Sequence, residues 1–213
     1  MGHRSEIFRL SDEYSKKIAK DDYISATWSK IHDNNHRWND YSFVEIDPFI
    51  KTAKQYKKKI LAAEPIDHYD EIAKKVILTE MDDYINSASD NWHYTNWGSM
   101  FSDPQSIYEV FQEMPRETDE DILNIVKRLE KIPQALNEWA DTLEVVKERG
   151  FVNAFLRVQY VIEIVHNIYE KGLFKEIALS VDPENERLAD AAHKADTAYR
   201  MLSGYLQNYI RDA

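Results

Sequence analysis

The sequence predicts an all-α fold, a multi-helix bundle of about seven to nine helices with one aromatic-rich loop, and three observations support this prediction. The 213 residues include only 5 Gly and 6 Pro, too few for the many tight turns of a β-sandwich or barrel. Apolar residues recur at steps of three and four along most of the chain, which is the spacing of one helix face. No segment shows convincing period-two alternation, the pattern of a half-buried strand.

The first half of the chain contains the following predicted helices: Ser5–Lys20, Tyr23–Ile31, Pro48–Ala63 and Tyr69–Ala88. Asp47 precedes Pro48, so a capping carboxylate stands before a proline at the first helical position, where the missing N–H costs nothing. Residues 32–45 are polar and are not predicted to be helical.

Three further helix starts are expected in the second half, at Asp103-Pro104, Thr118 and Asp182-Pro183. The Thr118 hydroxyl can cap its helix, and the acids that follow it lie at the positive end of the helix dipole. Gly150 and Gly172 are expected to end helices, because glycine adopts the left-handed conformation without a Cβ penalty.

Three apolar stripes follow these starts. Pro133 falls inside the first stripe, so we expect a kink or a break near Lys131 and Ile132. Small residues in the third stripe favour close approach of a neighbouring helix. The stripes are Ile122, Ile125, Val126, Leu129, Ile132, Leu136, Trp139, Leu143 and Val146; Phe155, Val158, Ile162, Val165 and Tyr169; and Leu188, Ala192, Ala195, Tyr199, Leu202, Leu206 and Tyr209.

Charge and composition exclude several classes of function. The 27 Lys and Arg against 38 Asp and Glu give a net charge of −11, which argues against nucleic acid as a partner. Five lysines and no acid lie in residues 51–59, forming either a basic docking patch or a solvated helix face. The chain has no Cys, which rules out disulfides and thiolate zinc sites. No apolar run suggests a secretory leader or a membrane partner, so we expect a cytoplasmic protein.

Familiar catalytic motifs are missing: the sequence has no phosphate-binding Gly-rich loop, no Gly-x-Ser-x-Gly and no His-Glu-x-x-His. Two spacings resemble metal sites, because each places a carboxylate and an imidazole three residues apart on a helix, as in di-iron bundles. These weak candidates are Glu163 with His166 and Asp190 with His193. The alternative is that they are exposed polar residues on amphipathic helices, and no cofactor is expected in this chain.

One loop, Asp90–Ser102, is unusually aromatic. Such a cluster can bind a ligand or contact another lobe, although aromatic clusters at helix junctions also serve as core packing. The candidate contact residues are Trp92, His93, Tyr94, Trp97 and Phe101.

Three blocks of the sequence resemble a bacterial family labelled domain of unknown function 885. They are residues 114–121 (MPRETDED), 128–136 (RLEKIPQAL) and the turn from Leu143 to Gly150. The family's opening is matched more loosely by residues 19–28 and 38–42. The sequence departs from the family pattern at Ser29, near a usual Gly, and at residues 146–148, which replace the usual Gly of the turn.

The resemblance implies a helical fold similar to zinc-dependent peptidases, whose His-Glu-x-x-His helix and later Glu lie in a C-terminal half. Residues 1–213 look like a single helical domain corresponding to the N-terminal third of such a protein, with the catalytic C-terminal lobe absent. No catalytic residue is carried over, and zinc is expected only in a full-length protein.

Three functions remain open at this level. The first is a non-catalytic lobe that walls a substrate cleft and packs on the missing catalytic lobe. The second is a stand-alone scaffold that self-associates, with a second copy as its partner. The third is a small metalloenzyme that uses the Glu163/His166 and Asp190/His193 pairs.

Overall fold

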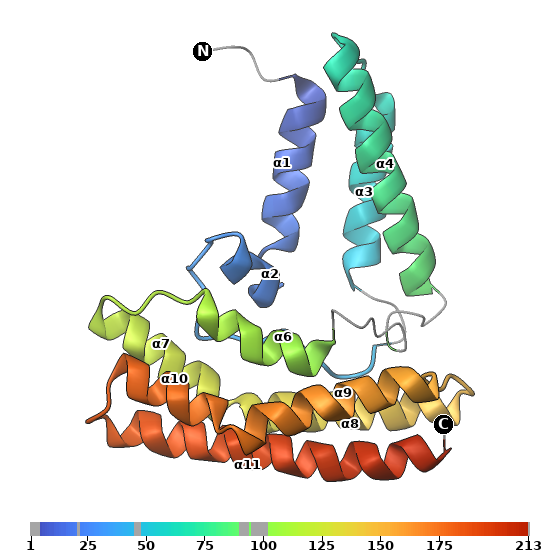
Figure 1. Cartoon of the computed structure of the whole chain (residues 1–213). Coiled ribbons are helices and arrows are strands. Elements are labelled where there is room, and N and C mark those ends of the chain that lie inside the picture. The colour runs from blue at the N-terminus through green and yellow to red at the C-terminus, as the bar shows by residue number, and fades with distance from the viewer. Residues whose placement is uncertain (1–4, 21, 45–47, 90–93, 95–101, 213) are drawn as a thin grey trace. The chain divides into compact units, whose positions relative to one another are not determined.

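The computed structural model describes residues 5–20, 22–44, 48–89, 94 and 102–212. Regular structure within these residues is helical, with no strand, which confirms the all-α class (Figure 1). No helix in this part of the chain combines the length and the apolar character needed to cross a bilayer.

The chain divides into two compact units, which are described separately below. Unit 1 comprises residues 1–21 and 44–93, and unit 2 comprises residues 22–43 and 94–213. The expectation that residues 1–213 form a single domain stays a prediction.

Unit 1 is built from three mutually packed helices, α1 (Glu6–Ile18), α3 (Pro48–Ala62) and α4 (His68–Ser89). Their core contains the buried side chains of Ile7, Leu10, Ile60, Ala63 and Met81. These bounds agree closely with the predicted helices. The predicted cap of α3, Asp47, lies outside the described residues.

Asp70 fastens the first turn of α4 to the start of α1. Its side chain is almost fully buried. The Ser5 hydroxyl donates to Asp70 Oδ1 at 2.6 Å, and the amide of Ile66 donates to Oδ2 at 3.1 Å. Ser5 also caps α1, because its Oγ accepts from the amide of Phe8.

Unit 2 is organised around the C-terminal helix α11, which contacts α7, α8, α9 and α10 (Figure 1). Seven apolar positions of the third predicted stripe are buried on α11, as expected. The elements of this unit are α2 (Tyr23–Trp28), α6 (Asp103–Glu109), η1 (Val110–Gln112), α7 (Asp119–Glu130), α8 (Ile132–Glu148), α9 (Phe155–Glu170), α10 (Leu173–Val181), α11 (Glu186–Tyr209) and η2 (Ile210–Asp212).

Several predicted boundaries in unit 2 are confirmed. Thr118 caps α7 in a full capping box, in which Asp121 accepts from the Thr118 amide. The chain breaks between α7 and α8 at Lys131, just before Pro133. Gly150 and Gly172 follow the ends of α8 and α9 with φ of +86° and +60°.

Two predicted helix starts differ in detail. Helix α6 begins at Asp103 itself after Ser102, and the Asp103 carboxylate accepts from Trp139 Nε1 at 2.9 Å instead of capping the helix. Asp182 does not start a helix, because it terminates α10. Helix α11 begins three residues after Pro183, where Asn185 Oδ1 accepts from the amide of Leu188 at 3.0 Å.

Arg128 on α7 organises the irregular segment that surrounds α2. The side chain is fully buried. Its guanidinium donates to the carbonyl of Arg37 at 3.0 Å, to Thr27 Oγ1 at 3.0 Å and to the carbonyl of Tyr23 at 3.1 Å. Trp38 packs against the same guanidinium, 4.8 Å from its ring centroid. Burial lowers the pKa of Arg128 to about 10, so the group stays charged at neutral pH.

Candidate functional site

The predicted aromatic cluster is only partly described. Trp92, His93, Trp97 and Phe101 lie outside the described residues. Tyr94 is half-buried, and its ring lies 5.3 Å from that of Phe43. The guanidinium of Arg149 covers Phe43 at 4.4 Å. The role of the loop in ligand or lobe contact therefore stays a prediction.

The weak metal candidates lie on exposed helix surfaces. Glu163 and His166 are exposed on α9, where His166 Nδ1 lies 2.8 Å from the hydroxyl of Tyr169. Asp190 on α11 forms an ion pair with Lys194 at 2.7 Å. Among the residues that the structure describes, no three His, Cys, Asp or Glu side chains gather closely enough to hold a metal ion.

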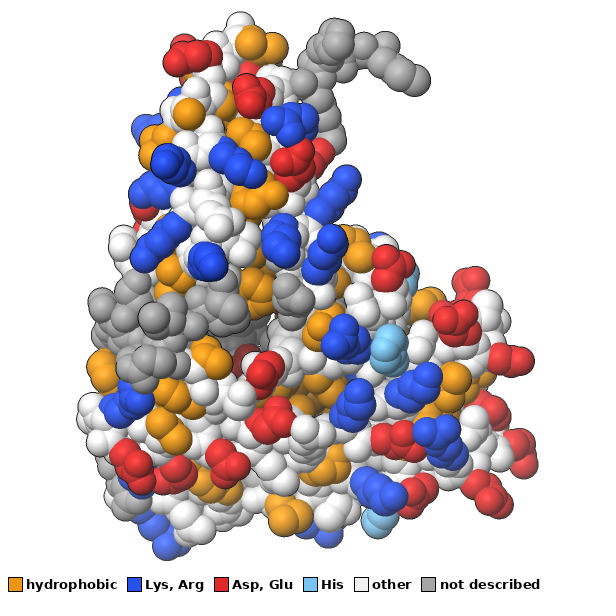
Figure 2. Space-filling model, turned by 180° about the vertical axis from the view of Figure 1, so that it is seen from behind, with side chains coloured by type: hydrophobic (Ala, Val, Ile, Leu, Met, Phe, Trp, Pro, Cys, Tyr) orange, Lys and Arg blue, Asp and Glu red, His pale blue; other side chains and the backbone are white. Residues whose placement is uncertain are grey.

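A basic groove runs between α3 and α4 of unit 1. It is lined by Lys54, Lys57, Lys58, Leu61, Ala62, Asp82, Ile85 and Asn86, and has a volume of about 610 Å³. Figure 2 shows Lys and Arg side chains gathered on unit 1 with apolar side chains between them. Lys57 forms an ion pair with Asp82 across the groove. The predicted lysine cluster is thus a largely solvated face with one interhelical ion pair.

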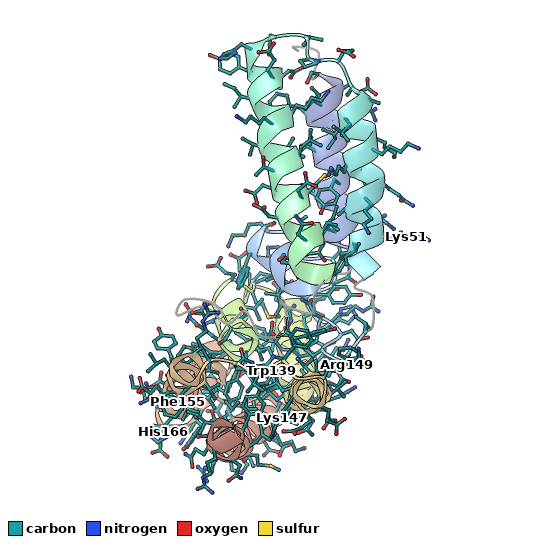
Figure 3. The ribbon with its side chains drawn as sticks, turned by 90° about the vertical axis from the view of Figure 1, so that its right-hand side faces the viewer. Lys51, Trp139, Lys147, Arg149, Phe155 and His166 are labelled. Atoms are coloured by element: carbon teal, nitrogen blue, oxygen red, sulfur yellow. The ribbon has the colours of Figure 1, made fainter. Side chains whose placement is uncertain are left out.

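The start of α9 exposes an apolar surface. Val152, Phe155, Leu156 and Tyr160 are all exposed, with Leu156 at 76% and Phe155 at 54%. We call these four residues the α9 apolar face. The prediction that Phe155 opens the buried stripe was wrong, because the buried side of α9 is formed by Val158, Val161, Val165 and Ile168. Phe155 and His166 lie instead on the outer side of the helix (Figure 3).

A pocket of unit 2 lies between α10 and α11, with a volume of about 260 Å³. Four charged or titratable side chains and an apolar floor line it. We call it the α10–α11 pocket, and its residues are Lys175, Ala178, Leu179, Asp182, Pro183, Ala189, Ala192, His193 and Asp196. Of the predicted site residues, only His193 belongs to it.

Among the residues that line this pocket, Asp196 has the most strongly shifted pKa. Burial raises the pKa of its carboxyl to about 6, although the amides of Phe174 and Lys175 act in the opposite direction. These amides belong to the first turn of α10, whose N-cap Gly172 offers no side chain. Asp196 therefore supplies from α11 the negative charge that the start of α10 favours.

Sequence reasoning missed Asp196 and Lys175 as site residues. A partial signal was present: Gly172 precedes a helix and has no side chain that could cap it, which leaves the first amides of that helix open to an acceptor from elsewhere in the chain. Which acid would do so could not be read from the sequence, since Asp196 lies 24 positions further along the chain.

A family model described as bacterial protein of unknown function (DUF885) matches residues 24–213, which is most of the chain. No curated protein matches the chain. The matched range covers all of the helices of unit 2 from α6 onward and the two later helices of unit 1. The chain therefore belongs to this bacterial family of unknown function.

Proposed function

We propose that residues 1–213 act as a non-catalytic helical lobe of a cytoplasmic, zinc-metallopeptidase-like protein. In this role the helices form one side of a substrate cleft and pack against a catalytic lobe. The sequence contains no His-Glu-x-x-His pattern, so the proposal assigns the zinc ligands to polypeptide other than these residues.

The α9 apolar face is the observation that carries the proposal. Large exposed apolar side chains that lie together on a surface are typical of protein–protein contacts. Tyr160 follows one helical turn after Leu156, so these two exposed side chains share one side of α9. Phe155 is also exposed and lies about 100° around the helix axis from Leu156. A docked lobe would bury this face.

The same face could instead bind a second copy of the chain, as a self-associating scaffold would require. A symmetric contact through α9 would bury the same four side chains twice. The two functions therefore differ in the partner of the face and not in the face itself.

The first experiment measures zinc content by elemental analysis and peptidase activity, with and without a chelator, on this chain and on the full-length gene product. The proposal predicts a zinc-free, inactive chain and a zinc-containing, chelator-sensitive gene product. Peptidase activity of the isolated chain that survives the chelator would contradict both functions.

The second experiment replaces Leu156 by Asp and measures the molar mass of the isolated chain by light scattering. The matched control is Met201→Asp, because Met201 is 69% exposed on α11. A monomer for wild type and both variants agrees with a lobe that lacks its partner. A wild-type dimer that only Leu156→Asp dissociates would establish the scaffold function instead.

A further inference from the structure

The basic groove of unit 1 has a charged wall and an apolar floor. Lys54 and Lys58 lie one helical turn apart on α3, and Leu61 follows on the same side of that helix. Ile85 and Asn86 contribute the α4 side of the groove. The lining residues of α3 extend for about 12 Å along the helix axis, which is slightly more than two turns.

The groove keeps a net positive charge. Asp82 supplies its negative charge and is already neutralised by the ion pair with Lys57. Lys54 and Lys58 are both exposed, and neither forms an ion pair with any residue that the structure describes. The ammonium groups of Lys54 and Lys58 are therefore available to an anionic partner.

Helix α3 cannot balance these charges by itself. Its sequence from Pro48 to Ala62 contains five lysines and no Asp or Glu. Lys51 continues the row by one further turn, and Figure 3 shows it projecting from the outer side of α3. Like charges at positions i and i+4 of a helix repel each other, as those of Lys54 and Lys58 do. Anionic side chains placed beside this row would remove the repulsion.

The apolar floor requires a partner that brings more than negative charge. Leu61 is 53% exposed, and it lines the groove together with Ala62 and Ile85. The apolar stripe of another helix would bury such a surface favourably, and a groove between helices is a common docking place for an amphipathic helix. Inorganic phosphate and the phosphate backbone of a nucleic acid have no apolar group for this floor.

The shape of this surface favours a helix over a lipid bilayer. A helix that binds a bilayer inserts its apolar side chains among the lipids, whereas these apolar residues lie in a groove of about 610 Å³ between two helices. The net charge of −11 also disfavours contact with an extended anionic surface.

We propose that the basic groove binds an acidic amphipathic helix of a partner protein. The apolar stripe of the partner helix would lie on Leu61 and Ile85. Asp or Glu residues on its flank, three or four positions apart, would pair with Lys54 and Lys58. This inference is independent of the proposed lobe function, because that function depends on α9 in unit 2.

The test is a titration of a fluorescently labelled peptide with residues 1–213, followed by anisotropy. The peptide has about 15 residues, the length at which an isolated helix becomes marginally stable. Leucines at positions i, i+3, i+4 and i+7 form its stripe, and glutamates form its flanks. A shuffled peptide of the same composition, with its leucines spread around the helix, keeps the charge and loses the stripe.

Saturable binding of the amphipathic peptide is expected, at least about tenfold tighter than that of the shuffled peptide, because only the first can bury its leucines on the groove floor. Equal affinity of the two peptides, or absence of saturable binding, would overturn the proposal.

Charge variants locate the binding in the groove. Lys54→Gln/Lys58→Gln should weaken binding of the amphipathic peptide about tenfold, because it removes two exposed ion pairs. The matched control is Lys16→Gln/Lys17→Gln, which removes the same charge from exposed positions of α1 and should leave the affinity unchanged. An equal loss of affinity in both double variants would show that only the overall charge matters and would refute the inference.

Apolar variants test the floor in the same way. Leu61→Ser should weaken binding about tenfold. Val76→Ser is its control, because Val76 is 54% exposed, almost as Leu61 is, and does not line the groove. Both replaced side chains are exposed, so both variants keep their fold. An affinity of Leu61→Ser equal to that of Val76→Ser would contradict the proposed contact.

Co-sedimentation with vesicles of phosphatidylserine and phosphatidylcholine tests the lipid alternative. No sedimentation of the protein with the vesicles is expected. Vesicle binding that Lys54→Gln/Lys58→Gln abolishes would overturn the proposal in favour of a membrane surface.

Discussion

Replacement of Arg128 by Met tests the central packing argument for unit 2. Arg128 is fully buried and donates to three acceptors in the segment around α2. Methionine fills most of the same volume, so the substitution removes the hydrogen-bond donors and creates only a small cavity. The loss of stability then depends on which of the three acceptors keep another hydrogen-bond partner.

The three acceptors are not equally dependent on Arg128. Thr27 Oγ1 also donates to the carbonyl of Tyr23 at 2.8 Å, so these two groups keep each other as partners. The hydrogen bond described for the carbonyl of Arg37 comes from Arg128, and an orphaned buried acceptor costs about 1–3 kcal/mol. The lost contact with Trp38 adds about 1 kcal/mol. We therefore expect Arg128→Met to lower the free energy of unfolding by about 3 kcal/mol.

Two further substitutions bracket this value. Arg128→Ala leaves a cavity in addition, which brings the expected loss to about 5 kcal/mol. Arg128→Lys retains the charge but not the planar fork of donors, so its loss of unfolding free energy is expected to lie between zero and that of Arg128→Met.

The assay is urea unfolding followed by tryptophan fluorescence, because Trp38 and Trp139 both belong to unit 2. Lys127→Met is the matched control, since it removes a positive charge from the preceding position of α7 without removing any of these hydrogen bonds. A midpoint for Arg128→Met equal to that of the wild type and of the control would refute the reasoning.

Three other predictions concern local features of the fold. Gly172→Ala should lower the free energy of unfolding by about 1 kcal/mol, because its φ of +60° is strained for alanine. Gly204→Ala should raise it by about 0.5–1 kcal/mol, because Gly204 lies within α11 with open space at its Cβ position. The thermal unfolding temperatures of the two variants should therefore move in opposite directions. Thr118→Ala removes half of the capping box of α7 and should cost about 1 kcal/mol, measured by urea unfolding, and an unchanged midpoint would contradict the capping role. Asp196→Asn should stabilise the protein at pH 7.5 and not at pH 4. The folded-state pKa of Asp196, about 6, exceeds the ordinary value of 3.8, so ionising this carboxyl costs stability in the folded protein. Stability therefore falls as pH rises between these two values, and the cost of ionisation is fully present above pH 6. That cost is about 1 kcal/mol after allowance for partial solvent screening, and equal stabilisation at both pH values would contradict the assignment.

The candidate site was harder to predict than the fold. Glu163, His166 and Asp190 carry suggestive spacings, yet they lie on exposed helix surfaces, because a spacing of three residues fixes a shared face but not whether that face points inward. His193 shares its pocket with Asp196 and Lys175, which no motif singled out. Phe155 was expected inside and lies outside, because α9 carries apolar residues on more than one side.

The sequence by itself determined the all-α class, the capping box at Thr118, the break before Pro133 and the helix ends at Gly150 and Gly172. These features depend on interactions between residues a few positions apart, so local preferences are sufficient to define them. Only the tertiary structure decided that Arg128 meets carbonyls about 90–105 positions away and that Asp196 serves the start of α10. Such pairings depend on how whole helix faces pack, and many faces of similar apolar character could have packed in other ways.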